Sequence, residues 1–230
     1  MVEVAPSAAA VDPATRARVL LAAGIDLHRA GRADEAIAAY SGAIESQPDL
    51  VEAHHNLGVT LRGQGCLDAA VACFRRALAL RPDHPATLAN LGNTLRARGD
   101  LPDAVELLRK AVDLDPRAPE IALGLALALR DAGHATDAVI AFTRAVELRP
   151  DRKAVQIERG VTRLLAGDLA GGFADLALRY PPPVVPVRGR SWPRWDGGVL
   201  DGRHLLVRAD DSLTDTLRFA RFVPPAIARG

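Results

Sequence analysis

The sequence repeats itself every 34 residues over most of its 230-residue length. A proline recurs four times and a glycine five times at this interval. Proline cannot continue a helix and glycine accepts the left-handed backbone that ends one, so both residues mark helix ends. A period of this length predicts two helices per unit, with neighbouring units stacked into one array. The recurring residues are Pro48, Pro82, Pro116 and Pro150, and Gly31, Gly65, Gly99, Gly133 and Gly167.

Small residues recur in phase with these helix ends, and a bulky residue follows four positions after one set of them. A small residue lets two helices approach closely, and the bulky residue fills the space between them. Apolar residues between the helix ends recur at helical spacing. We therefore predict an all-α fold of repeated helix–turn–helix units. The residues in phase are Gly24, Gly58, Gly92, Ala126 and Gly160; Ala36, Ala70, Ala104 and Ala138, followed by Tyr40, Phe74, Leu108 and Phe142; Ala43, Ala77, Ala111 and Ala145; and Leu27, Leu61, Leu95 and Leu129.

This unit resembles the tetratricopeptide repeat (TPR). The resemblance covers residues 17–152 in four full repeats, and it implies a right-handed superhelical solenoid. We expect residues 1–12 to be disordered and the solenoid to occupy residues 13–180. One repeat carries the family's pattern as Leu57-Gly58, Leu61, Ala70, Phe74, Ala77 and Pro82.

A fifth, degenerate repeat begins at Lys153. It keeps Gly160 and Gly167, but it has Arg163 in place of the recurring leucine and Gly172 in place of a recurring alanine. Terminal repeats are atypical because one of their sides has no neighbouring repeat to pack against. We predict that this repeat caps the array.

The resemblance implies a concave groove lined by the first helix of each repeat. One groove position holds His28, Arg62, Arg96 and Arg130 in successive repeats. Such a basic stripe suits an acidic peptide, because arginine pairs well with carboxylates. The alternative is that an arginine-rich protein places arginine on any solvated face.

Asparagines occupy two other groove positions, at Asn56, Asn90 and Asn93, and His55 also belongs to the groove. Asparagine carries a donor and an acceptor, so it can pair with an extended peptide backbone. O-linked N-acetylglucosamine transferases use a similar asparagine ladder at the position of Asn56 and Asn90 to hold a substrate peptide. The alternative is that these asparagines cap or bridge neighbouring helices.

Several other kinds of site are not expected. Chaperone-binding TPR domains hold a carboxylate with lysine and asparagine, but Leu21, Ile25 and Ala86 occupy three of those positions. His54 and His55 are adjacent, so they cannot share a helix face, and no cysteine or acidic cluster nearby offers metal spacing. We predict no metal site and no cofactor.

Composition and charge limit the partners further. The formal net charge of +1 gives no overall attraction to nucleic acid. The longest near-apolar run, residues 121–129, is too short to span a bilayer, and the N-terminus has no secretory signal pattern. Two cysteines fit a reducing compartment. We expect a cytoplasmic protein with no nucleic-acid partner and no membrane insertion.

The composition changes after the repeats. Residues 181–203 are rich in proline and glycine, which predicts a linker. Residues 204–209 then read as a short strand and residues 213–229 as a helix. A strand followed by a helix is half of a βαβ unit, so we predict a short α/β remnant at residues 204–230.

This tail resembles the start of the heptosyltransferase-like domain in bacterial TPR–glycosyltransferase fusions, through residues 193–197, 205–207, 214–216 and 219–222. The resemblance implies that Asp215 occupies the place of a base at the acceptor sugar. The loop at residues 210–214 lacks the glycines that allow close approach to a phosphate. The sequence also ends before a donor-binding half, so we expect no catalysis from this chain as it stands.

We therefore predict a non-catalytic module that binds a peptide or protein segment in the TPR groove. Asn56, Asn90 and Asn93 would hold the backbone, and the arginines would favour acidic side chains. One alternative is the acceptor-recognising part of a bacterial glycosyltransferase that works with a separate donor-binding polypeptide. A second alternative is a structural module that forms a homodimer through the edge strand of its tail.

Overall fold

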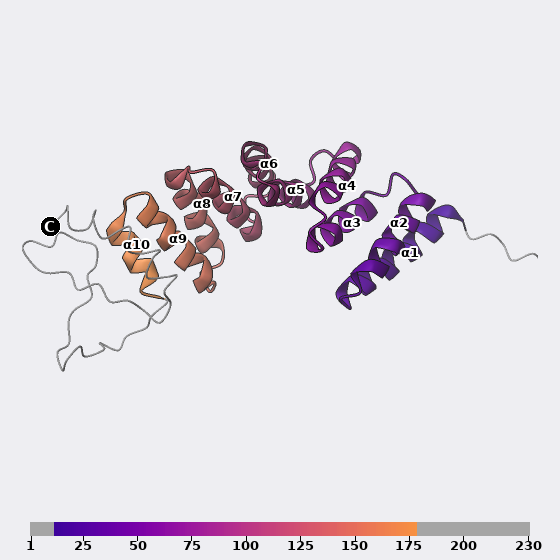
Figure 1. Ribbon diagram of the computed structural model, residues 1–230, viewed down its shortest axis with the longest axis horizontal. Helices are drawn as coiled ribbons and strands as arrows, with labels where there is room; N and C mark the ends of the chain where they lie inside the picture. Colours follow the sequence, from indigo (N-terminus) through magenta and orange to yellow (C-terminus); the bar gives the residue numbers. More distant parts are fainter. Residues whose placement is uncertain (1–11, 179–230) are drawn as a thin grey trace, which may run out of the picture. The chain divides into compact units, whose positions relative to one another are not determined.

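The computed structural model describes residues 12–178, and these residues form ten α-helices without a β-strand (Figure 1). The all-α prediction is confirmed for this part of the chain. The predicted linker, the strand and helix of residues 204–230, and Asp215 lie outside the described residues, as does the predicted disordered segment up to residue 11. The chain divides into two compact units, Met1–Pro116 and Arg117–Gly230, and each is described by itself below.

The first unit contains three helical hairpins, and the second helix of each hairpin packs against the first helix of the next one. This order is the one that stacked TPR units have. The helices are α1 (Pro13–Arg29), α2 (Ala33–Ser46), α3 (Val51–Gly63), α4 (Leu67–Leu80), α5 (Pro85–Arg98) and α6 (Leu101–Leu114).

The second unit contains two hairpins in the same order, within the described residues. Its helix α8 packs against α9, as the second helix of one hairpin against the first helix of the next. The helices are α7 (Pro119–Asp131), α8 (Ala135–Leu148), α9 (Lys153–Leu165) and α10 (Leu169–Leu176).

The predicted helix ends fall at the recurring glycines. Gly99 follows α5 with a φ of 100°, a left-handed conformation that glycine adopts without a steric penalty. The four equivalent glycines of the other hairpins also have positive φ. Helix α1 begins at Pro13, ahead of the first repeat at residue 17, because the Asp12 carboxylate caps it by accepting from the backbone N–H of Thr15 at 3.1 Å.

Small residues bring the two helices of each hairpin together, as the sequence predicts. A Cβ atom on Gly58 of α3 would lie 2.7 Å from Cε1 of Phe74 on α4. The ring of Phe74 is fully buried, and so is Ala70 one turn earlier. The same relationship joins Gly24 to Tyr40, where the Cβ would lie 2.6 Å from the ring. The small and bulky positions of the repeat therefore form one packing unit, because the ring fills the space that glycine leaves.

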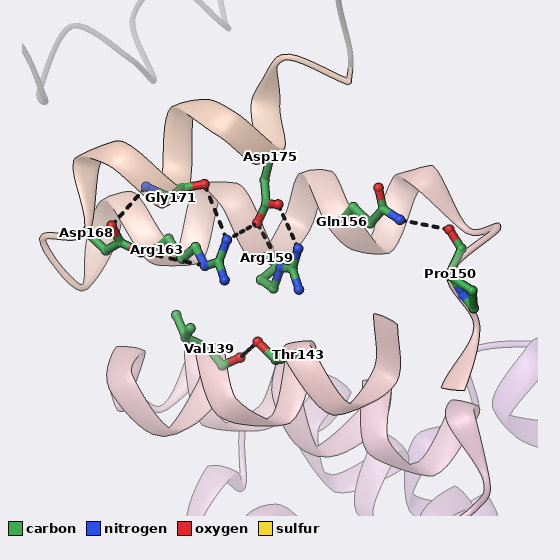
Figure 2. Close-up of polar contacts among 9 residues, drawn as sticks. All are labelled: Val139, Thr143, Pro150, Gln156, Arg159, Arg163, Asp168, Gly171 and Asp175. Atoms are coloured by element: carbon green, nitrogen blue, oxygen red, sulfur yellow. Dashed lines mark hydrogen bonds and ion pairs between the residues drawn. The ribbon is translucent and has the colours of Figure 1, made fainter. Parts of the chain in front are cut away.

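The fifth hairpin replaces apolar contacts with charged ones. Arg159 and Arg163 on α9 stand where the second hairpin has Leu57 and Leu61. Both guanidinium groups reach the Asp175 carboxylate on α10, which stands where the second hairpin has Cys73 (Figure 2). In the first unit, those three apolar side chains belong to the core that joins the first and second hairpins.

The fifth hairpin is also the one in which two glycines face each other. A Cβ on Gly160 of α9 would lie 3.0 Å from the carbonyl oxygen of Gly172 on α10, and a Cβ on Gly172 would lie 2.5 Å from Cδ2 of Leu164. The glycine at the recurring alanine position therefore allows a closer approach of the two helices than alanine would.

Candidate functional site

The first helices of the first unit share one polar face. His28 of α1 contacts Thr60 of α3, with 3.0 Å between Nδ1 and Oγ1. His55 of α3 contacts Thr87 of α5, with 2.7 Å between Nδ1 of His55 and Oγ1 of Thr87. Each contact joins a helix to the equivalent helix of the next hairpin, so the predicted groove residues of α1, α3 and α5 lie on adjoining surfaces.

Two histidines share one hydroxyl on this face. The Thr87 Oγ1 atom lies 2.7 Å from Nδ1 of His55 and 2.6 Å from Nδ1 of His84, the residue that precedes α5. The two imidazole rings meet edge to face, with their centroids 5.6 Å apart. The ring of Phe74 approaches His55 edge-on at 5.9 Å. Thr87 is fully buried, so these histidines supply the partners that its hydroxyl needs.

The surroundings of His55 disfavour a positive charge on its ring. Burial lowers its pKa, and the neighbouring His84 and Arg62 lower the pKa further, while Glu52 acts in the opposite direction. The Asn90 amide nitrogen lies 3.5 Å from Nε2 of His55, an arrangement that suits a ring nitrogen without a proton.

The three predicted asparagines differ in their surroundings. All are half-buried, but only Asn90 contacts another first helix through its side chain, at His55. Within residues 12–178, the side-chain amides of Asn56 and Asn93 have no hydrogen-bond partner, and neither amide is sealed from solvent. The helix-bridging alternative therefore describes Asn90, whereas Asn56 and Asn93 keep donors and acceptors available.

The arginines of the predicted basic stripe have different surroundings. Arg62 is half-buried on α3, burial lowers its pKa, and no acidic side chain among the described residues pairs with it. Arg96 is half-buried on α5. Arg130 belongs to the second unit, where it pairs with Glu158, lies 3.5 Å from the Asp131 carboxylate and stacks over the Phe142 ring at 5.9 Å.

Buried threonines, which the sequence pattern did not single out, lie on the first helices; Thr60 and Thr94 belong to this face, and Thr162 has the equivalent position on α9 of the second unit. Thr60, Thr94 and Thr162 recur at the repeat interval, which is the signal that could have identified them. Each hydroxyl donates to the backbone carbonyl four residues earlier, at Asn56, Asn90 and Glu158 respectively. These bonds satisfy the buried hydroxyls, and Thr60 also contacts His28.

His54, next to His55, has a structural place. It is buried, and its Nε2 atom donates to the Pro48 carbonyl oxygen at 2.9 Å, which ties α3 to the preceding turn. No group of three or more potential metal ligands occurs in the described part of the chain. None of the helices there has both the length and the apolar character needed to cross a membrane.

Models of one protein family match the chain along its repeats. Models described as tetratricopeptide repeat or TPR repeat match residues 24–65, 49–117, 89–153 and 123–183. Together these matches run from residue 24 to residue 183 of the 230. A search of curated protein sequences gives no match.

Solved structures show the same fold. A structure described as MamA protein has a TM-score of 0.64 and 18% identity, over 74% of this chain and 98% of that one. MamA from Desulfovibrio magneticus RS-1 has a TM-score of 0.64 and 20% identity, over 71% of this chain and 91% of that one. YrrB, described as a TPR protein with an unusual peptide-binding site, has a TM-score of 0.60 and 19% identity, over 69% and 82% of the two chains. At these identities the likeness establishes the fold alone.

Proposed function

Because this chain belongs to the tetratricopeptide-repeat family, we propose that it is a protein-interaction module that holds an extended partner segment on its first helices. TPR proteins present these helices as a concave surface, and their partners are protein segments. The described peptide-binding site of YrrB, which has the same fold, supports this class of function. Fold alone does not identify a function, so the proposal depends on the side chains of the face.

The observation that carries the proposal is the hydrogen-bonding capacity left open on this face. The amides of Asn56 and Asn93 have no hydrogen-bond partner within the described residues. The hydroxyls of Thr60, Thr87 and Thr94 on the same helices all have partners. An amide offers a donor and an acceptor, which are the groups that an extended backbone needs on each residue. We assign Asn56, Asn90 and Asn93 to the partner's backbone.

We assign Arg62 to an acidic side chain of the partner. A half-buried guanidinium without an acidic neighbour gains more from a carboxylate than a fully solvated one does, because burial strengthens the attraction. Arg96 and His28 belong to the same proposed surface on neighbouring helices. Arg130 is a weaker candidate, since Glu158 already neutralises it.

The experiment compares a glutamate-rich peptide with a glutamine-rich peptide of the same length, by fluorescence anisotropy. We expect the glutamate-rich peptide to bind more tightly, and Arg62→Gln to weaken its binding by about tenfold, since a charge-assisted hydrogen bond contributes about 1.5 kcal/mol. The matched control is Arg76→Gln, which removes the same charge from an exposed position of α4. Equal affinities for the Arg62 and Arg76 variants would remove the assignment of this site.

The two other functions remain predictions. The glycosyltransferase alternative rests on Asp215 and the dimer alternative on the strand at residues 204–209, and both lie outside the described residues.

A further inference from the structure

The histidine pair and Arg62 share one face of the first unit. His55 lies two helical turns before Arg62 on α3, and its side chain reaches Thr87 and Asn90 of α5. It therefore lies among the residues proposed to hold the partner, and a histidine is a side chain whose charge can change near neutral pH.

The hydrogen bonds around Thr87 suit an arrangement of protons in which its hydroxyl links the two histidines. The Asn90 amide donates toward Nε2 of His55, so the proton of that ring is on Nδ1 and is donated to the Thr87 hydroxyl. The hydroxyl in turn donates its own proton to Nδ1 of His84. In this arrangement a second proton on His55 must be placed on Nε2, facing the Asn90 amide.

The surroundings of His55 oppose a positive charge while the face is empty. From α3 itself, Arg62 repels a proton on the ring and Glu52 attracts one. The segment before α5 contributes His84, α5 contributes the uncharged Thr87 and Asn90, and α4 contributes the ring of Phe74. An added carboxylate on this face would reverse the balance, because it supplies the negative charge that Glu52 alone does not.

We propose that His55 is part of the partner site and takes up a proton from solvent when an acidic segment binds there. This inference rests on the proposed function. The proton bonds to Nε2, and the Asn90 amide rotates to present its oxygen or gives way to the partner's carboxylate as the acceptor. Binding of an acidic segment is then coupled to pH and strengthens as the pH falls.

The size of the coupling follows from linkage. Each unit by which the bound carboxylate raises the pKa of His55 gives up to about tenfold tighter binding once the ring is protonated in the complex. The glutamate side chains of the probe stay ionised above about pH 6, so the change reports the protein and not the peptide.

The test is isothermal titration calorimetry of the full chain with the glutamate-rich peptide, at about pH 6 and about pH 7.5. Repeating the titration in buffers of different ionisation enthalpy counts the protons taken up. We expect proton uptake and several-fold tighter binding at the lower pH, and we expect His55→Asn to lose both effects. His134→Asn is the matched control, since it removes an exposed histidine at the start of α8 in the second unit.

Each outcome decides between the two proposals. Binding that is equally tight at both pH values without proton uptake overturns this inference and leaves the acidic-peptide site intact. Absence of binding at both pH values overturns the proposed function together with this inference. If His55→Asn unfolds the chain, the histidine resonances of the unmodified protein give the answer by NMR, because the peptide must raise the pKa of His55. A pKa of His55 that the peptide leaves unchanged overturns the inference.

Discussion

The Arg159 guanidinium donates two parallel hydrogen bonds to the Asp175 carboxylate, at 2.8 and 2.7 Å, and joins α9 to α10. Arg163 donates to the same carboxylate at 3.0 Å. The side chains of Arg159 and Asp175 are only 14% and 9% exposed, so this ion pair differs from the solvated pairs elsewhere on the chain. A buried carboxylate between two guanidinium groups is costly to leave incomplete, because removal of one partner strands a buried charge.

We predict that Asp175→Ala lowers the free energy of unfolding by about 3 kcal/mol, because the largely buried Arg159 loses its counter-ion and Arg163 keeps only Asp168, 3.7 Å from its Nε atom. Urea unfolding followed by circular dichroism measures the change. Asp151→Ala is the control, since Asp151 pairs with Arg149 at an exposed position and should have little effect. Equal unfolding midpoints for the two variants would contradict a structural role for the buried pair.

Replacement of the whole cluster is predicted to be tolerated. Arg159→Leu, Arg163→Leu and Asp175→Ala together restore the apolar character that the second hairpin has at these positions. Buried ion clusters replaced by apolar side chains often leave stability unchanged or increase it. A triple variant less stable than Asp175→Ala alone, by the same urea measurement, would show that the charges are required for packing.

Gly58→Ala is predicted to destabilise the first unit, because its Cβ would lie 2.7 Å from the Phe74 ring. Overpacking of this kind costs about 1–3 kcal/mol. Gly63→Ala is the matched control on the same helix, since no heavy atom lies within 4 Å of its added Cβ. That substitution should be neutral or stabilising by up to about 1 kcal/mol, because alanine favours helix. Thermal unfolding of both variants tests the prediction, and a Gly58→Ala protein as stable as the control would refute the close-packing account.

The first unit is predicted to lose stability as the pH falls. The folded-state pKa of His55 is lowered below its ordinary value near 6.5, so the unfolded chain binds more protons in this range. The contribution of His55 to the free energy of unfolding is therefore fully present above the ordinary pKa of histidine. It declines as the pH falls from that pKa toward the lower pKa of the folded state. Urea unfolding across this pH range measures the decline, and His55→Asn should reduce its slope. A slope that the substitution leaves unchanged would assign the pH dependence to other groups.

The helix ends and the helix pairs were predictable because they depend on local chemistry that recurs with the repeat. Gly99 adopts the left-handed backbone that ends a helix, and Pro82 follows the end of α4, where proline cannot continue it. The small Gly58 opposite the bulky Phe74 likewise indicates how the two helices of a hairpin pack. The degenerate fifth repeat was also visible, through Arg163 at a leucine position.

The side-chain partners were not predictable in the same way. Asp175 lies sixteen residues from Arg159 in the sequence, and Thr87 lies thirty-two residues from His55. Whether the two side chains of each pair touch depends on how their helices cross. The pairing of Arg130 with Glu158, which are twenty-eight residues apart in the sequence, is of the same kind. A repeat pattern defines which faces meet, but the register of the crossing selects the atoms that touch.

The central claim is that an acidic partner segment lies along the first helices, held by their asparagines. The most direct measurement is a proton–nitrogen NMR spectrum of the isotope-labelled chain, recorded while the glutamate-rich peptide is added. The account predicts that the side-chain amide signals of Asn56, Asn90 and Asn93 shift together with increasing peptide. Shifts confined to the second helices α2, α4 and α6, with the three asparagine signals unmoved, would contradict it.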